Sequence, residues 1–338
     1  MPLVLRSLAS VVLVFVAWSA SAQSTLETVQ KRGSLVCGVN GEAPGFSQPD
    51  ANKQWQGLDV DLCRAVAAAA LGDANKVTYV PTTAAERFDV LAAGKIDLLA
   101  RNSTVNLQRT AGSKVRFAVV NYYDGQAFVV PKKLGIDRVP GLADKIVCVT
   151  KGTTHEFNMA AYLKLRQMQA LVMNFDTADD MYKGFFAGRC QAVTQDATAL
   201  AAAVVASGKA TDYAMLPDII SKEPLGPYVR DGDAQWPDIV RWSFHAMLEA
   251  EERSITQNNV DGKLEAQDPN VRRLLGIVPG NGKALGLSER WAYNIVKQVG
   301  NYDESFERNV GQGSPLKFGR GINALWTKGG VMYPLPLR

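Results

Sequence analysis

The sequence lacks the features that mark several large classes of protein. Beyond its N-terminal segment, no apolar run approaches the ~20 residues that a membrane-spanning helix needs. Its formal net charge is only +4, and its 37 basic and 33 acidic residues are interspersed, so neither a nucleic acid nor a membrane surface is indicated as a partner. We therefore expect a soluble chain.

Motifs for catalysis and nucleotide binding are also missing. There is no G-x-S-x-G nucleophile elbow, and the segment 280–284 does not complete a phosphate-binding loop. His155 and Glu156 form the one suggestive acid–base pair, but no second histidine follows at the spacing of the zinc-protease motif. His245 lies in an apolar helix and is assigned to the core. No catalytic residue, metal ligand or cofactor is predicted.

Cysteine is scarce, with four residues in the chain. They form no C-x-x-C pair and lie near no histidine cluster, which argues against a metal site. Of the three possible pairings we favour Cys37 with Cys63 and Cys148 with Cys190, because each pair then lies within one strand-and-helix neighbourhood. Four buried free thiols are the alternative.

The N-terminus reads as a secretory signal peptide over residues 1–22. Arg6 is followed by the apolar segment Leu8–Ala17 and by small residues that end at Ala22. We expect cleavage after Ala22 and export from the cytoplasm; an uncleaved anchor is the alternative. The remaining chain exceeds the usual size of one domain, so two lobes are expected.

Strands and helices are predicted to alternate twice along the chain. This alternating order of strands and helices indicates an α/β fold with parallel sheets and right-handed crossovers. The expected strands are 34–39, 76–80, 96–100, 127–131, 145–149, 170–175 and 190–194, and the expected helices are 58–71, 84–93, 154–168, 178–187, 197–206 and 236–252. We expect lobe 1 to comprise 23–130 and 228–338, and lobe 2 to comprise 131–227. Two hinge crossings, near 130 and 228, would then flank a binding cleft.

The first candidate binding corner follows the apolar strand Ile96–Ala100. Asn102 and Thr104 provide polar groups at the carboxyl end of that strand, where open α/β sheets bind ligands. Arg109 follows Thr104 by about one and a half helical turns, so the two side chains can converge on one anion. A guanidinium group suits a planar carboxylate, and the alternative is a polar turn with a surface arginine.

A second corner is expected in lobe 2. Thr153 and Thr154 stand between a strand and a helix, where free N–H groups favour an anion, although either could be an ordinary N-cap. Asp196 ends another strand and is expected to face the cleft, with helix capping as its alternative role. A cation at Arg109 and an anion at Asp196 together describe a site for an α-amino acid.

The order of these motifs resembles the polar amino acid binding proteins of bacterial ABC importers, solute-binding protein family 3. The C-terminal third resembles the longer subgroup of general L-amino acid binding proteins. The segments that carry the likeness are 33–39, 57–67, 94–97, 104–109, 152–154, 291–293, 299–302, 306–311 and 325–326.

This resemblance implies a type II periplasmic binding fold with a C-terminal helical extension from about residue 262. It implies that Arg109 holds the α-carboxylate of an L-amino acid with Asn102 and Thr104, that Thr153 and Thr154 complete that cage, and that Asp196 binds the α-ammonium group. The expected protein is a periplasmic monomer of broad specificity that delivers its ligand to an inner-membrane ABC permease. No cofactor and no nucleic acid partner are expected.

The part of the site that would contact the ligand's side chain differs from the pattern of the family. Ala43 stands where relatives often place an aromatic shelf, so we interpret Phe46 as the candidate ligand-contacting aromatic, with a structural role as its alternative. Arg87 and Arg101 would favour acidic ligands if they point inward, although pairing within the lobe is the expected role. A cyclohexadienyl dehydratase-like enzyme and a sensing-only receptor remain the alternative functions.

Overall fold

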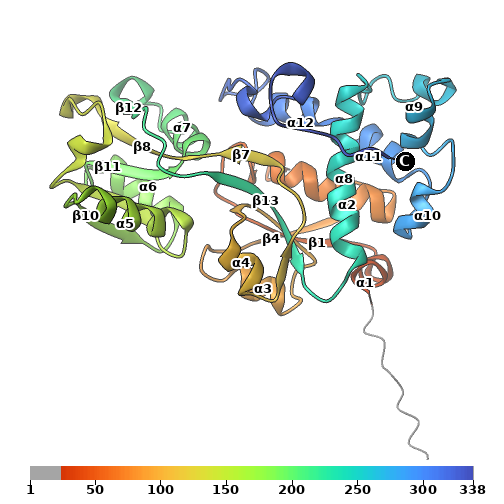
Figure 1. Cartoon of the computed structure of the whole chain (residues 1–338), viewed down its shortest axis with the longest axis horizontal. Helices are drawn as coiled ribbons and strands as arrows, with labels where there is room; N and C mark the ends of the chain where they lie inside the picture. Colours follow the sequence, from red (N-terminus) through yellow and green to blue (C-terminus); the bar gives the residue numbers. More distant parts are fainter. Residues whose placement is uncertain (1–23, 338) are drawn as a thin grey trace, which may run out of the picture.

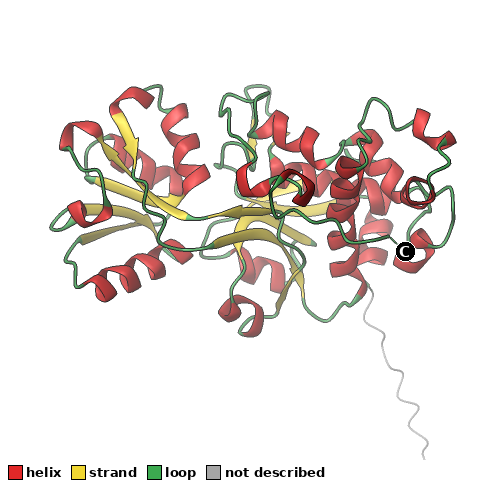
Figure 2. Cartoon of the chain, turned by 45° about the horizontal axis from the view of Figure 1, so that its top comes forward, coloured by secondary structure: helices red, strands yellow, loops and turns green. Residues whose placement is uncertain are grey.

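The computed structural model describes residues 24–337, so the predicted signal peptide lies outside the described residues. Two α/β lobes lie side by side, joined by strands that run between them (Figure 1). In each lobe a sheet is flanked by helices (Figure 2). None of the helices in the described part of the chain is both long and apolar enough to span a membrane.

Lobe 1 is built on a six-stranded sheet with the order β4-β1-β5-β13-β6, in which β7 also pairs with β13. The neighbours β4, β1 and β5 are parallel, whereas β13 runs antiparallel to β5. The strands are β1 Leu35–Val39, β4 Val77–Pro81, β5 Leu98–Thr104, β6 Val115–Phe117, β7 Tyr122–Asp124 and β13 Glu223–Arg230, with a small ladder of β2 Gln48–Pro49 and β3 Trp55–Gln56. The helices are α1 Thr25–Arg32, α2 Leu58–Leu71, α3 Arg87–Ala92 and α4 Leu107–Ala111.

Lobe 2 is built on a five-stranded sheet with the order β10-β9-β11-β8-β12. Its strands are β8 Gln126–Pro131, β9 Ile146–Thr150, β10 Leu171–Phe175, β11 Ala192–Asp196 and β12 Tyr213–Met215. Its helices are α5 Thr154–Arg166, α6 Ala178–Phe186 and α7 Ala197–Ala206. The parallel strands β9, β10 and β11 bring their carboxyl ends to one edge of the sheet, where ligands bind in such folds.

The lobe crossings differ from those expected from the sequence. Strand β8 was expected in lobe 1, but it pairs with β11 and β12 of the second sheet. The chain therefore crosses at Gly125, between β7 and β8, and again at 216–222, between β12 and β13. An apolar strand is recognisable from its sequence, but its partner strand is chosen by long-range pairing that no local pattern reveals.

The C-terminal extension packs on lobe 1. Helix α8 Gln235–Glu252 lies against α2, and α11 Trp291–Gln298 contacts both. Trp291 and Ile295 are buried among α2 and α8 residues, whereas Trp326 is 48% exposed. The remaining helices are α9 Pro269–Leu274, α10 Asn281–Leu285 and α12 Tyr302–Asn309, with short 3-10 turns at Lys132–Leu134, Val139–Leu142, Ala210–Asp212, Gly262–Glu265, Gly321–Asn323 and Trp326–Lys328.

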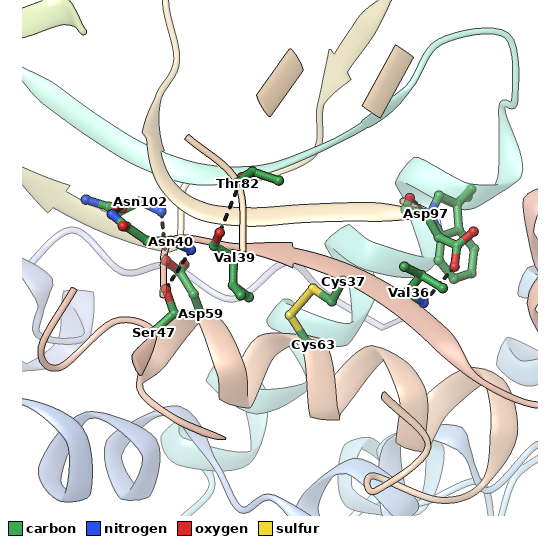
Figure 3. Close-up of a disulfide and its surroundings, with 11 residues drawn as sticks. Val36, Cys37, Val39, Asn40, Ser47, Asp59, Cys63, Thr82, Asp97 and Asn102 are labelled. Carbon is green, nitrogen blue, oxygen red and sulfur yellow. Dashed lines mark hydrogen bonds between the residues drawn. A yellow bond between two sulfur atoms is a disulfide. The ribbon is translucent and has the colours of Figure 1, made fainter. Parts of the chain in front are cut away.

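Both favoured disulfides form. Cys37 on β1 bonds Cys63 on α2, and Cys148 on β9 bonds Cys190 just before β11. Figure 3 shows the first disulfide, which joins β1 of lobe 1 to α2. Each bridge fastens a helix or loop to the sheet whose strand ends line the cleft.

Candidate functional site

A cavity opens between the two lobes and measures about 830 Å³ together with its mouth. It lies at the carboxyl ends of β5, β9 and β11, where polar side chains replace the apolar ones of the strand interiors. Asn102, Thr104, Arg109, Thr153, Thr154 and Asp196 all line it. Thus six predicted residues from the two lobes meet in one cavity.

Contacts with residues of lobe 1 place the Arg109 side chain at the end of β5. Its Nη1 donates to the carbonyl oxygen of Thr104 at 2.7 Å, and the hydroxyl of Tyr228 donates to the same oxygen at 2.9 Å. The guanidinium carbon also lies 5.3 Å from the centre of the Phe88 ring. Burial lowers the pKa of Arg109, partly opposed by Tyr228, Glu223 and Asp196. The guanidinium group is thus oriented, and no carboxylate of the described residues 24–337 forms an ion pair with it.

Asn102 lies near the end of β5 and lines the cavity. Its φ is +32°, in the left-handed region that asparagine tolerates better than most residues. Its backbone N–H donates to Asp59 Oδ2 at 2.7 Å, and its side-chain oxygen accepts from Asn40 at 3.2 Å, as Figure 3 shows. Burial of Asp59 raises the pKa of that carboxyl to about 7, although the N–H of Asn102 opposes the shift.

The two threonines of lobe 2 have different roles. Thr153 is the N-cap of α5: its hydroxyl accepts from the Glu156 N–H at 3.4 Å and donates to the Thr150 carbonyl at 2.7 Å. Thr154 instead turns its hydroxyl toward Glu223, to which it donates at 2.9 Å. Gly152 has a φ of +69°, a conformation that glycine adopts without strain and that turns the chain from β9 into α5.

Asp196 stands at the N-cap position of α7 but makes no side-chain capping hydrogen bond. It is 2% exposed, and its Oδ1 lies 2.9 Å from His155 Nε2. Burial alone would lower the pKa of His155, but the charges of Asp196, Glu223 and Asp124, with the Asp196 hydrogen bond, outweigh it and raise that pKa overall. Sequence reasoning considered His155 only as a catalytic candidate and missed this contact.

Glu223 was also missed. It opens β13, is 1% exposed, and accepts from Thr104 at 2.5 Å and from Thr154 at 2.9 Å. Its second oxygen accepts from Asn158 and Ser221. A buried carboxylate needs such donors, and here they come from both lobes. The one available sequence signal was an acidic residue at the start of an apolar strand.

His155, Asp196 and Glu223 place potential metal-ligating atoms within 4.8 Å of one another. Among the described residues they form the one such group of three or more. The Glu223 oxygens already accept from hydroxyls and an amide, and Asp196 is already bonded to His155. The donor set is therefore satisfied as a hydrogen-bonded network.

Arg87 and Arg101 line the cavity, and both also hydrogen-bond within lobe 1, which is the role expected for them. Arg101 Nε donates to the Thr82 carbonyl oxygen, and burial lowers its pKa to about 10 although Asp59, Glu42 and Glu86 oppose the shift. Arg87 is 3% exposed, donates to the Ala84 carbonyl oxygen, and leaves its Nε without a partner. Burial, with the repulsion of Arg101 and Arg109, lowers the pKa of Arg87 well below its ordinary value.

Phe46 does not line the cavity, which corrects its assignment as a ligand contact. It is 2% exposed and packs edge-to-face on Tyr122 at 5.2 Å between ring centres. Ala43 is likewise buried in the lobe 1 core. Among the described residues, no Phe, Tyr or Trp lines the cavity. The apolar character of Phe46 serves packing, and the walls of the site are polar.

The cavity therefore carries positive charge on lobe 1, at Arg109, and a carboxylate on lobe 2, at Asp196. A small ligand with charges of both signs would bridge the lobes and be enclosed by them. A two-lobed α/β chain with such a cavity has the architecture of proteins that bind a small ligand in the cleft between two lobes. Residues 35–264 match the bacterial extracellular solute-binding proteins, family 3, and the chain belongs to that family.

Relatives match along nearly the whole chain. The general L-amino acid-binding periplasmic protein of Rhizobium johnstonii is 46% identical over 322 residues, covering 95% of this chain and 94% of the relative. The glutamate/glutamine/aspartate/asparagine-binding protein of Rhodobacter capsulatus is 46% identical, covering 97% of this chain and 98% of the relative. A periplasmic binding protein of an ABC transporter from Brucella ovis, solved with glutathione bound, is 44% identical with a TM-score of 0.91, covering 94% of this chain and all of that one.

These similarities confirm the family and the fold class that the sequence motifs predicted. The protein is a periplasmic solute-binding protein. They assign no individual residue to a ligand contact.

Proposed function

We propose that this protein binds L-amino acids between its lobes and delivers them to the membrane permease of an ABC importer. The observation that carries the proposal is the meeting of Arg109 and Asp196, from different lobes, in one cavity. Arg109 holds the α-carboxylate, with the side-chain NH2 group of Asn102 as a further donor. The one hydroxyl hydrogen of Thr104 is donated to Glu223, so Thr104 supports the wall of the site. Asp196 binds the α-ammonium group. The names of the Rhizobium and Rhodobacter relatives support the ligand class.

The same cavity favours ligands with a second anionic group. Within the part of the chain that the structure describes, Arg87 is a buried cation that pairs with no carboxylate, and its Nε has no hydrogen-bond partner. A ligand carboxylate would supply the missing counter-charge, which makes L-glutamate and L-aspartate favoured ligands. The polar walls and the absence of a lining aromatic in the described chain support broad specificity.

The length of the ligand is not closely limited by the cavity. Its mouth is open to solvent, so a ligand held inside can extend outward. The Brucella protein was solved with glutathione, which is itself built on a glutamate residue. A ligand anchored at its amino acid end by Arg109 and Asp196, and extending toward Arg87, is compatible with both observations.

A transport role is favoured over the dehydratase-like alternative. One structural neighbour, 28% identical with a TM-score of 0.58, is an ancestral amino acid-binding protein described as a precursor of cyclohexadienyl dehydratase. The relatives at 46% identity are named as transport binding proteins. We propose a monomer that acts with its permease and without catalysis.

The test is isothermal titration of the purified chain, lacking residues 1–22 and stripped of ligand by unfolding and refolding, against the common L-amino acids. We expect binding of several chemically different amino acids, with L-glutamate and L-aspartate among the tightest. Binding of one amino acid alone would contradict broad specificity. Binding of carboxylates that lack an amino group, and of no amino acid, would contradict the proposal and bring the dehydratase-like alternative forward.

A further inference from the structure

The ammonium-binding corner of the cavity already contains a basic side chain. His155, in the first turn of α5, is 5% exposed and lies with Nε2 2.9 Å from Asp196 Oδ1. Both residues line the cavity. The carboxylate that would receive the ligand's ammonium group is therefore partnered before any ligand arrives.

Three acidic groups face the His155 ring from three different strands. Asp196 ends β11, Glu223 opens β13, and Asp124 ends β7 beside the crossing at Gly125. From β8, Gln126 donates its amide to the His155 carbonyl oxygen at 3.1 Å and so fixes the start of α5. His155 is therefore fixed at two points: its backbone carbonyl oxygen is bonded to Gln126, and its ring is bonded to Asp196.

The acidic groups are not equally available to balance a positive charge. Glu223 accepts four hydrogen bonds from hydroxyls and an amide. Asp124 accepts from the N–H groups of Gly125 and Thr198, and burial, with the repulsion of Asp196, raises its pKa to about 7. Asp196 is the acidic group in direct contact with the ring, and it stabilises the imidazolium form.

We propose that His155 positions Asp196 for the ligand and that binding of an α-ammonium group releases a proton from His155. The inference rests on the proposed function and concerns the regulation of the same site. The ring keeps its Nε2–H donor to Asp196 in both charge states, so the hydrogen bond persists. The proton leaves Nδ1 as H⁺ to the buffer, and the ring becomes neutral while the ligand's cation takes its place beside Asp196.

Electrostatic repulsion in a buried site explains why binding of the ligand's ammonium group would release a proton from His155. Two cations that share one carboxylate at close range oppose each other's binding, and the effect is strong where water is excluded. By linkage the opposition is reciprocal: the ligand lowers the pKa of His155, and protonated His155 weakens the ligand. Affinity for amino acids therefore rises with pH, by at most about tenfold per pH unit because one proton is exchanged. A carboxylate ligand without an amino group leaves His155 protonated.

The experiment measures protons released per ligand bound. L-Glutamine is titrated into the signal-peptide-free protein by calorimetry at about pH 6–8 in two buffers that differ in ionisation enthalpy. We expect a release of up to one proton, absent when glutaramic acid, which lacks the α-amino group, is the ligand. His155→Gln, which keeps a donor to Asp196, is expected to bind L-glutamine with no release. His245→Gln is the matched control and should release as the native protein does, because His245 lies on α8 outside the cavity lining.

A second measurement needs no variant of the site. The chain contains two histidines, so each ring gives a resolvable signal in a proton NMR titration, and His245→Gln assigns them. In the ligand-free protein His155 should titrate above 6.5, its ordinary value, and L-glutamine should lower that pKa. Burial lowers the pKa of His245 to about 4, and the ligand should leave it unchanged.

The outcomes separate the two proposals. Binding of L-glutamine without proton release, or equal release from the native protein and His155→Gln, would overturn the role of His155 and leave the proposed function intact. Binding of no amino acid at all would overturn both. Release that disappears in His155→Gln alone supports the inference.

Discussion

The hydroxyl oxygens of Thr104 and Thr154 lie 3.5 Å apart although they come from different lobes. Both hydroxyls donate to Glu223 Oε2, at the start of the strand that carries the chain back into lobe 1. One buried carboxylate therefore joins the lobe 1 corner, the lobe 2 corner and a crossing strand. A ligand that bridges the lobes acts on parts already connected through Glu223.

Replacing Glu223 by Gln should destabilise the protein by about 1–3 kcal/mol. The amide group of glutamine would face hydroxyl and amide donors, so buried groups that now pair with the carboxylate lose an acceptor. Urea unfolding of the ligand-free protein measures the effect. Glu265→Gln, on an exposed surface, is the matched control and should change stability by less than about 0.5 kcal/mol. Equal stability of the two variants would mean that Glu223 is not the connection described above.

Arg109→Ala should abolish measurable binding of every amino acid. Truncating one partner of a buried charge pair typically costs about 2–5 kcal/mol, which is a loss of at least about thirtyfold in affinity. The control is Arg116→Ala, because Arg116 is 51% exposed and pairs with Asp231 at the surface of lobe 1. Titration calorimetry measures the affinity of both variants for amino acids. If Arg109→Ala binds with native affinity, Arg109 does not contact the ligand.

Asp196→Asn should weaken L-glutamine far more than glutaramic acid. The carboxylate is proposed to bind the ammonium group, which the deaminated compound lacks, while both ligands keep the carboxylate that Arg109 holds. We expect a difference of at least tenfold between the two losses of affinity. If both ligands lose affinity equally, the aspartate contributes to the structure of the site and not to ammonium recognition.

Arg87→Gln should have opposite effects on stability and on binding of acidic ligands. Without ligand, removing a buried cation that contacts no carboxylate should raise the thermal unfolding temperature. Affinity for L-glutamate should fall about tenfold or more relative to affinity for L-glutamine, because the second carboxylate loses its partner. Unchanged preference between the two amino acids would show that Arg87 contacts no part of the ligand.

Asp59→Asn should stabilise the protein above about pH 7 and have little effect near pH 4. Burial raises the pKa of Asp59 to about 7, so between the unfolded value of about 4 and this folded value the folded chain binds more protons than the unfolded chain. Stability from this group is therefore present at low pH and lost as pH rises through 7. The gain at pH 8 should be roughly 2–4 kcal/mol, since each pKa unit is worth about 1.4 kcal/mol. The free energy of unfolding of the native protein and of Asp59→Asn, measured across this pH range, checks the prediction. If the two free energies change with pH in the same way, the prediction is wrong.

Local signals in the sequence determined most of the secondary structure. The helices over 58–71 and 197–206 form with the predicted bounds, because their apolar runs begin after strand-ending polar residues and α2 ends at Gly72 in the left-handed conformation. The pairing of the cysteines also followed from short-range order along the chain, and both favoured disulfides form. Arg109 and Asp196 were recognisable because each follows the end of a buried strand.

Only the tertiary structure decided which strands pair and which charges meet. Strand β8 has the same apolar sequence whichever sheet it joins, and Phe46 is equally suited to a core or a ligand shelf until its neighbour Tyr122 is known. His155 and Glu223 acquire their roles from Asp196 and Thr154, which lie 41 and 69 residues away along the chain. Periodicity and turn chemistry act over a few residues, whereas burial of a charge and its compensation depend on every element packed around it.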